Sequence, residues 1–284
     1  MELLSNTLFR NDDLIVKNAT LNKNKIAWWL SMPHLSGGKY LYDLFELSHA
    51  TLTNVGSGYG WTSSTRPGGY SQIYLSGNTD YLSITDQSKF QFGTSNFTIS
   101  GWFKLDTLNN TNANGQQVII SRYESAGSKG FYVSVNTSGS IIFNISLSGA
   151  SNASFASSTG LIATNTWYHF TAVRSGLSCF IYVNGKLEAS GTSAALWSLS
   201  STTQNVLLGD MVDSSSNHYY LSGIIDDICI YNIDLPSFYA YRIYEESRLG
   251  YPSTLHRMRI TRPFHIGAPW AYYTMLQNTY GVAL

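Results

Sequence analysis

The sequence has 284 residues, of which 43% are hydrophobic and only 12% are charged, and its formal net charge is zero. A chain without excess positive charge has little to neutralise phosphates, which argues against a nucleic-acid partner. No run of about 18 apolar residues occurs, which argues against a transmembrane helix. The first residues also lack the basic start and apolar stretch of a secretory signal. We therefore expect an unexported protein without a membrane partner.

The chain divides into an N-terminal arm, a compact domain and a C-terminal tail. Residues 1–25 show no sustained periodicity and form the arm. The domain is predicted to span residues 26–250, beginning with the apolar strand Ile26–Leu30. Alternation over residues 97–105 predicts a half-buried strand, with Phe97, Ile99, Gly101, Phe103 and Leu105 on one face. Further strands are predicted at residues 71–75, 81–84, 118–122, 131–135, 141–147, 167–173, 179–183, 186–189, 206–208 and 224–231.

Two dipeptides predict tight turns between neighbouring strands. Gly77-Asn78 separates the strands at 71–75 and 81–84, and Asn184-Gly185 separates those at 179–183 and 186–189; both predict hairpins. Short strands separated by Gly, Ser and Asn clusters are typical of an antiparallel sandwich rather than of βαβ units. The sequence therefore predicts an all-β fold.

Only residues 235–249 have a helical pattern, which Gly250-Tyr251-Pro252 ends. The tail at residues 251–284 contains more aromatic residues than a polar disordered segment would. Two interpretations stay open for it: the tail packs on its own domain, or it docks on a partner. Its rings are Phe264, Trp270, Tyr272, Tyr273 and Tyr280.

Three segments together resemble the laminin-G-like jelly roll of the concanavalin-A-like superfamily. They are FTISGWF at residues 97–103, WYHFTAVR at 167–174 followed by IYVNGK at 181–186, and GIIDDICIYN at 223–232. The resemblance covers residues 26–250. It implies a two-sheet antiparallel jelly-roll sandwich with one short C-terminal helix.

The exit from the helix, residues 244–252, is similar to that of laminin-G-like proteins from tailed bacteriophages. This similarity implies a non-catalytic structural protein on the virion surface, made in the cytoplasm of the host and used for capsid decoration or fibre attachment. Its partners would be the major capsid protein or a fibre, and copies of itself. The alternative is a lectin-like, carbohydrate-binding module that recognises host-surface glycans.

The sequence offers no good pair of catalytic carboxylates. Glycosidases of this architecture align an acid and a nucleophile in a Glu-x-Asp-x-Glu strand. None of the six glutamates stands in such a pattern, so we expect no enzymatic activity. The histidines show no metal-ligand spacing, and His169 is predicted to be structural.

Calcium is the candidate ion, because it takes oxygen ligands from loops and strand ends. The resemblance places Asp226 nearest such an ion, with Asp80 or carbonyl groups of residues 76–80 beside it. The alternative is that Asp226 accepts hydrogen bonds from backbone amides at the start of a strand.

Glycan binding requires aromatic platforms, and the candidates in loop-like regions are Trp61, Trp197, Tyr219 and Tyr220. Cys179 and Cys229 both lie in strand-like runs and are predicted to be buried free thiols. A disulfide between them is the alternative.

Overall fold

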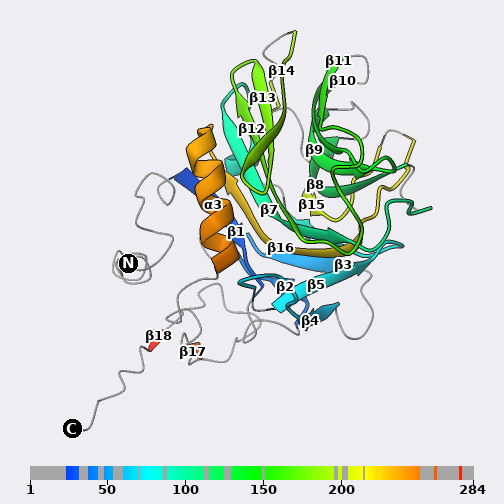
Figure 1. Cartoon of the computed structure of the whole chain (residues 1–284), viewed down its shortest axis with the longest axis vertical. Coiled ribbons are helices and arrows are strands. Elements are labelled where there is room, and N and C mark those ends of the chain that lie inside the picture. Colours follow the sequence, from blue (N-terminus) through cyan, green and yellow to red (C-terminus); the bar gives the residue numbers. More distant parts are fainter. Residues whose placement is uncertain are drawn as a thin grey trace.

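The computed structural model describes most of the predicted domain. The described residues are 24–31, 38–43, 48–53, 60–69, 71–85, 88–111, 115–124, 129–148, 151–194, 198–199, 204–213 and 215–249, with two short strands at 259–260 and 275–276. They form two antiparallel sheets packed face to face as a jelly-roll sandwich (Figure 1). Within this part of the chain, no helix is both long and apolar enough to cross a bilayer.

The first sheet, sheet A, has eight strands in the order β14-β13-β12-β7-β16-β5-β4, and β1 also pairs with β16. Its strands are β1 (Lys25–Trp29), β4 (Trp61–Ser63), β5 (Ser71–Ser76), β7 (Phe97–Leu105), β12 (Tyr168–Ser175), β13 (Ser178–Val183), β14 (Lys186–Thr192) and β16 (Ser222–Tyr231). Sheet A therefore brings together segments from the beginning, the middle and the end of the domain.

The second sheet, sheet B, also has eight strands, in the order β11-β10-β9-β8-β15-β6-β3-β2. Its strands are β2 (Tyr40–Leu41), β3 (Ala50–Thr53), β6 (Tyr81–Ile84), β8 (Gln116–Glu124), β9 (Lys129–Asn136), β10 (Ile141–Ser148), β11 (Ser151–Ala156) and β15 (Val206–Leu208). The described part of the tail adds one antiparallel pair, β17 (Arg259–Ile260) with β18 (Met275–Leu276).

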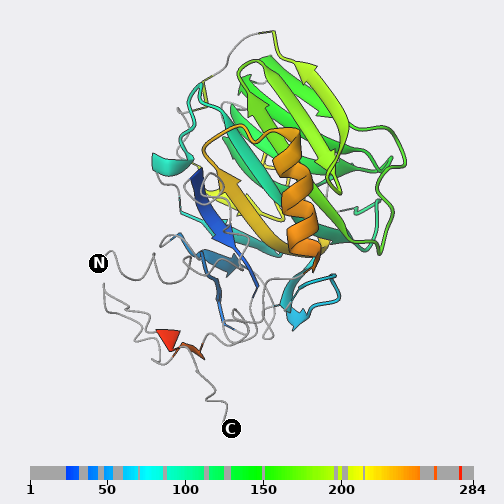
Figure 2. The same ribbon diagram turned by 60° about the vertical axis from the view of Figure 1, so that its left-hand side comes forward.

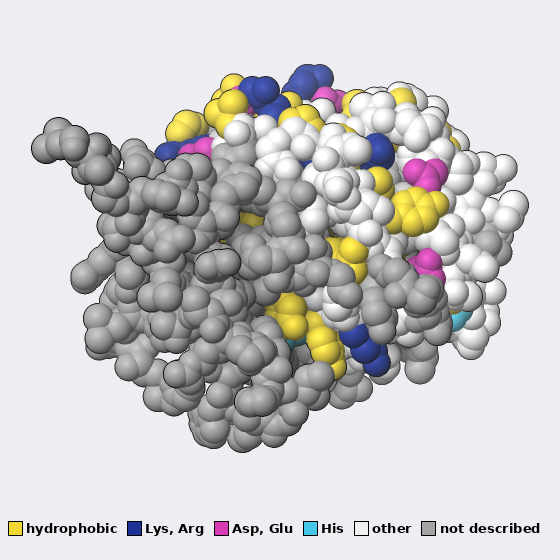
Figure 3. All heavy atoms as spheres, turned by 90° about the horizontal axis from the view of Figure 1, so that it is seen from below, with side chains coloured by type: hydrophobic (Ala, Val, Ile, Leu, Met, Phe, Trp, Pro, Cys, Tyr) yellow, Lys and Arg dark blue, Asp and Glu magenta, His cyan; other side chains and the backbone are white. Residues whose placement is uncertain are grey.

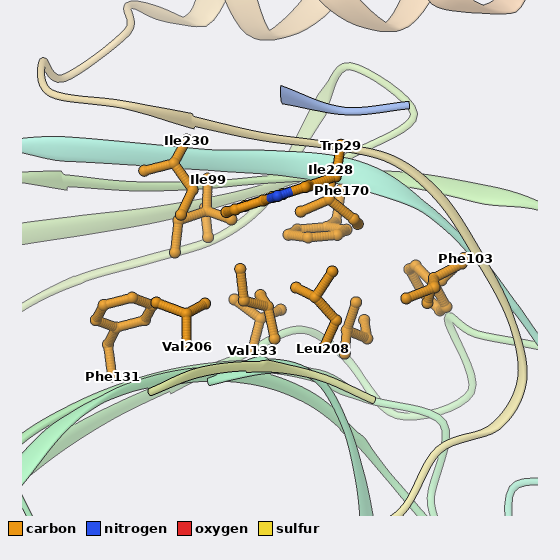
Figure 4. Close-up of a cluster of buried hydrophobic side chains, with 14 of the residues drawn as sticks. Trp29, Ile99, Phe103, Phe131, Val133, Phe170, Val206, Leu208, Ile228 and Ile230 are labelled. Atoms are coloured by element: carbon orange, nitrogen blue, oxygen red, sulfur yellow. The ribbon is translucent and has the colours of Figure 1, made fainter. Parts of the chain in front are cut away.

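The hydrophobic core lies between the sheets. Ile99, Phe103 and Ile228 of sheet A point toward Val133 and Leu208 of sheet B (Figure 4). All five side chains are buried. The predicted inward face of residues 97–105 is confirmed: a Cβ on Gly101 would meet Ile228 Cδ1 at 2.3 Å, so glycine suits the close approach of the strands there.

Sheet A is covered on its outer face as well. The helix α3 (Ser237–Leu249) lies across it, as the orange ribbon in Figure 2 shows. Beneath α3, the Trp102 indole nitrogen donates to Ser247 Oγ at 2.9 Å, and the Trp102 ring lies edge-on to His169. The prediction that residues 97–105 form a half-buried strand is therefore wrong, because the helix removes the second face from solvent.

The two predicted turns differ in outcome. Asn184-Gly185 joins the paired strands β13 and β14, with positive φ at both residues, so this hairpin is confirmed. The hairpin at Gly77-Asn78 is wrong, because β5 belongs to sheet A and β6 to sheet B. That turn carries the chain from one sheet to the other.

Other predictions of local structure are largely confirmed. The helix begins two residues after the expected start, and both cysteines are free and buried. Four strands lack a clear sequence pattern: β2, β3, β4 and β11. The strand β11 is rich in Ser and Asn, which hides its alternation.

His169 should make the fold sensitive to acid. Burial, and then the Arg66 guanidinium, lower its pKa from an ordinary 6.5 to about 3. Between these two pH values the unfolded chain binds more protons than the folded chain, so stability falls as pH falls from 6.5 to 3. The variant His169→Phe keeps a ring against Trp102 but does not titrate. Urea unfolding should show that, between pH 6.5 and pH 3, the free energy of unfolding of His169→Phe falls by about 4 kcal/mol less than that of the wild type.

An equally steep loss of stability in the wild type and in His169→Phe would contradict this assignment. Substitution of the partly exposed His218 serves as the control. That change should leave the steep loss from His169 in place.

Candidate functional site

The clearest candidate site is the segment from Gly209 to Leu221, here called the 209–221 loop. It leaves sheet B after β15, where Gly209 N donates to Ile119 O at 2.9 Å. It returns where Val118 N donates to Tyr219 O at 3.0 Å, and Val212 and His218 form a bridge between these points. The loop is therefore a small hairpin held at its base by β8.

Asp210 holds this base together. Its side chain is fully buried, its Oδ1 accepts from Tyr219 N at 3.0 Å, and its Oδ2 lies 2.7 Å from His218 Nδ1. Burial raises the pKa of Asp210, and the hydrogen bonds with His218 and Tyr219 oppose that shift. Asp210 thereby fixes the orientation of the His218 ring, which is partly exposed.

Asp213 organises the tip of the hairpin. Its Oδ1 accepts from the backbone amides of Ser215 and Asn217 at 2.8 and 2.9 Å. Its Oδ2 accepts from Asn217 Nδ2 at 3.0 Å and from the Tyr219 hydroxyl at 2.9 Å. Burial opposes ionisation of Asp213, but these hydrogen bonds outweigh it and lower the pKa. The carboxylate is thus ionised and fully engaged with its own loop.

Aromatic rings flank the loop on two sides. The His218 and Tyr220 rings are stacked, with centroids 4.6 Å apart and planes 9° from parallel. On the other side Tyr219 lies near Tyr123 of β8 and Tyr132 of β9. Burial, Asp213 and these two phenols raise the pKa of Tyr219 to about 12. All five side chains are partly exposed, so the loop presents fixed rings to solvent.

Asp80 lies beside this loop. Its Oδ2 accepts from Ser76 N at 3.0 Å, and Asn110 Nδ2 connects the adjoining turn to the loop by donating to Gly77 O and to Tyr220 O. The pKa of Tyr220 is raised by burial and then by the charges of Asp210 and Asp80, among other groups. The structure therefore brings together three predicted site residues: Asp80, Tyr219 and Tyr220.

Asp226 lies elsewhere, in the middle of β16 under α3. Its Oδ2 accepts from Arg66 Nε at 2.8 Å, and its Oδ1 accepts from Ser31 N at 3.2 Å. Burial raises the pKa of Asp226 to about 6, although Arg66 opposes the shift. Asp226 thus accepts a hydrogen bond from a backbone amide, as the alternative to calcium binding predicts. It does so at the centre of a strand and not at its start.

This donor set does not fit calcium at Asp226. Both of its carboxylate oxygens are engaged, and the neighbouring positive charge is a buried guanidinium. In the described part of the chain, no three His, Cys, Asp or Glu side chains are placed to hold a metal ion together. The calcium prediction therefore depends on Asp80 and the adjoining turn, and it stays a prediction.

The two predicted tryptophans do not join the loop. Trp61 lies on β4, at the edge of sheet A; its ring packs against the core, and its indole nitrogen donates to Gly38 O at 2.8 Å. Trp197 lies outside the described residues, so its predicted role is untested.

Sequence reasoning missed five residues that shape this site: Tyr123, Tyr132, Asp210, Asp213 and His218. One signal was available, because Asp213 precedes a run of Ser and Asn, and this pattern is typical of a side-chain-capped turn. The two strand tyrosines carried no such signal. They reach the loop only because β8 and β9 lie beside it in sheet B.

A family model described as the concanavalin A-like lectin/glucanases superfamily, of the laminin-G type, matches residues 76–237. This match covers more than half of the chain. The chain belongs to this superfamily. A comparison with curated proteins finds no match.

Solved structures with the same fold include receptor-binding domains of toxins. The binding domain of Paraclostridial Mosquitocidal Protein 1 has a TM-score of 0.62 at 16% identity, covering 79% of this chain and 52% of that chain. The botulinum neurotoxin serotype G binding domain has a TM-score of 0.58 at 19% identity, covering 78% and 51%. The binding domain of botulinum neurotoxin DC in complex with SialylT has a TM-score of 0.59 at 14% identity, covering 80% and 52%. The present chain therefore spans about half the length of each of these three chains. The similarity shows that they share a fold.

The order of the hairpin tip should depend on Asp213. The variant Asp213→Ala removes the acceptor of the Ser215 and Asn217 amides, so their hydrogen-exchange rates should rise about tenfold, the equivalent of about 1.4 kcal/mol. The control Ser215→Ala changes an exposed side chain and keeps the amide. Equal exchange in both variants would show that Asp213 does not hold the tip.

Proposed function

We propose that this superfamily member is a non-catalytic, lectin-like domain that binds glycans at the 209–221 loop. The observation that carries the proposal is the stacked pair of His218 and Tyr220, held beside two fixed carboxylates on an exposed hairpin. Sugars present apolar C–H faces to aromatic rings and hydroxyl groups to polar side chains. A loop with both kinds of group suits such a ligand.

The rings are held in place before any ligand arrives. The Tyr219 hydroxyl donates to Asp213, and His218 pairs with Asp210. A ligand that stacks on preorganised rings loses less binding free energy to the ordering of side chains. The loop can therefore bind a small, well-hydrated molecule with a limited contact area.

The carboxylates of the loop favour binding over hydrolysis. Glycosidases place two carboxyl groups on either side of the scissile bond, with their oxygens directed at the substrate. The oxygens of Asp210 and Asp213 instead accept hydrogen bonds from Tyr219, Ser215 and Asn217 of the same loop. Their part in the proposed function is to position the rings.

The similar solved structures lend further support. They are named as binding domains, and one of them is in complex with SialylT. Another is in complex with rat synaptotagmin II, so this fold also serves protein ligands in that relative. The exposed rings and hydrogen-bonding groups of the 209–221 loop favour a glycan here.

Removing the loop rings should weaken glycan binding. On a glycan array followed by calorimetric titration, Tyr219→Ala and Tyr220→Ala should each reduce affinity about fivefold, because an aromatic contact contributes about 1 kcal/mol. The control is Tyr241→Ala, which removes an exposed tyrosine from α3 on the outer face of sheet A. Equal affinity in all three variants would place the glycan elsewhere, and a wild-type chain that binds no glycan would refute the function.

The same titrations test the calcium prediction. They are run with added calcium and again after treatment with a chelator. Binding that requires calcium and is lost in Asp80→Asn would support an ion beside the loop. Unchanged heats under both conditions would remove calcium from the proposal.

A role on the surface of a phage particle is a second candidate. The observation that favours it is the apolar outer side of α3, where Phe238, Tyr241 and Leu249 are 63%, 54% and 74% exposed. Exposed apolar groups of this size are often found at contacts between proteins. Major capsid protein, a fibre or a further copy of the chain would be the partner.

Deletion of the terminal segments tests this second role. Residues 1–23 and 251–284 can be removed without cutting β1 or α3, so the sandwich should remain folded by circular dichroism. We expect each truncated chain to lose attachment to its particle or oligomer, measured by light scattering and electron microscopy. Unchanged assembly after both deletions would exclude attachment through these segments.

A further inference from the structure

The elements around the 209–221 loop carry almost no basic residues. The sequence has no Lys or Arg between Lys186 and Arg242, a stretch that includes the whole loop. It also has none between Arg66 and Lys89, where the Asp80 turn lies, or between Lys129 and Arg174, which spans most of β9 and all of β10 and β11. On the face shown in Figure 3, uncharged atoms make up most of the described surface, and acidic and basic side chains are scattered over it.

The basic residues of β7, β8 and β9 make contacts away from the loop. Arg122 of β8 is fully buried and donates to Leu199 O. Lys129 stands opposite Glu124 in the register of β8 and β9. Lys104 lies on sheet A, where it donates to Thr65 Oγ1 and lies over the Trp167 ring.

Negative charge, in contrast, gathers at the loop. Asp210 and Asp213 belong to it, and Asp80 lies close enough for its charge to act on the Tyr220 phenol together with that of Asp210. Asp213 is held ionised by four hydrogen bonds and has no basic partner among the described residues. The rings therefore stand in a negative local field.

We infer that the 209–221 loop selects uncharged glycans and discriminates against glycans that carry carboxylate or sulfate groups. This inference rests on the proposed function and specifies its ligand class. An acidic sugar stacked on Tyr220 would approach the carboxylates without a Lys or Arg side chain to compensate its charge, and the His218 ring is already paired with Asp210. Such like-charge contact is a common source of specificity in binding sites.

The experiment compares glycans that differ only in charge. The full-length protein is titrated with lactose and with 3′-sialyllactose, and with the strongest neutral array ligand and its sialylated and sulfated forms. At 20 mM salt we expect the neutral member of each pair to bind at least about tenfold more tightly. Salt screens charge over about 10 Å at 0.1 M, so the difference should shrink at 0.5 M.

Two variants show whether the loop carboxylates cause the discrimination. Asp80→Asn removes a charge and keeps an oxygen that can accept a hydrogen bond from the Ser76 amide. It should reduce the ratio of the affinities for neutral and charged glycans at least about twofold. Ser215→Lys adds a cation at the exposed tip of the hairpin and should reduce this affinity ratio further. The control Asp234→Asn alters a carboxylate that accepts from Ser175 Oγ on sheet A, and it should have no effect.

The outcomes separate this inference from the proposed function. Sialylated ligands that bind as tightly as neutral ones, with ring variants still reducing affinity, would overturn the selectivity and leave glycan binding intact. Discrimination that is unchanged by salt, by Asp80→Asn and by Ser215→Lys would also overturn it. Binding of no glycan of either kind would refute the proposed function and this inference with it.

Discussion

The burial of sheet A on both faces is the constraint on which the rest of the structure depends. All ten residues of β16 are buried, because one face meets the core and the other lies under α3 and its neighbours. Polar groups on the covered face must then find partners within the protein. Asp226 pairs with Arg66, the Trp28 indole donates to Asp227, and the Trp102 indole donates to Ser247. The Trp102 contact anchors α3 to the sheet, and Arg66 adds to it by donating to Ser247 O at 3.0 Å.

This arrangement assigns different roles to the two outer faces of the sandwich. On sheet A, Trp102 donates to Ser247 of α3, and Asp226 is engaged by Arg66 beneath the same helix. Sheet B has no helix over it among the described residues, and the 209–221 loop rises from it instead. The partly exposed rings of Tyr123, Tyr132 and Tyr219 therefore lie on the side of the sandwich that no described helix covers. The position of α3 on sheet A thus supports our proposal that the binding site lies at the 209–221 loop.

Much of the fold could be predicted because it depends on local patterns. Alternation identified the inward residues of β7, and Asn184-Gly185 identified its hairpin, since both effects act between near neighbours. The burial of the outer face of β7 could not be predicted, because it depends on a helix more than 130 residues away in sequence. The turn at Gly77-Asn78 failed for a related reason: a turn signal specifies a change of direction, and the partner of the next strand is decided by packing.

The site was predictable to a smaller extent. Tyr219 and Tyr220 could be recognised as loop aromatics, and the family resemblance pointed to Asp80. Their relation to His218 and Asp210 could not be read from the sequence, because it is created by the hairpin. The sequence leaves two interpretations of Asp226 open, a calcium ligand or an acceptor of backbone amides. It cannot decide between them, because the Arg66 guanidinium comes from a segment 160 residues earlier.

The contrast between Asp226 and Asp213 explains how the same residue type serves structure in one place and specificity in another. A fully buried carboxylate requires a strong partner, and at Asp226 a guanidinium supplies it. Asp213 lies at the surface, where four hydrogen bonds from its own turn are enough to keep it ionised. Because those donors are neutral, they stabilise the charge without cancelling it. The loop consequently keeps negative charge beside its rings, and the selectivity that we propose follows from the way its hairpin is built.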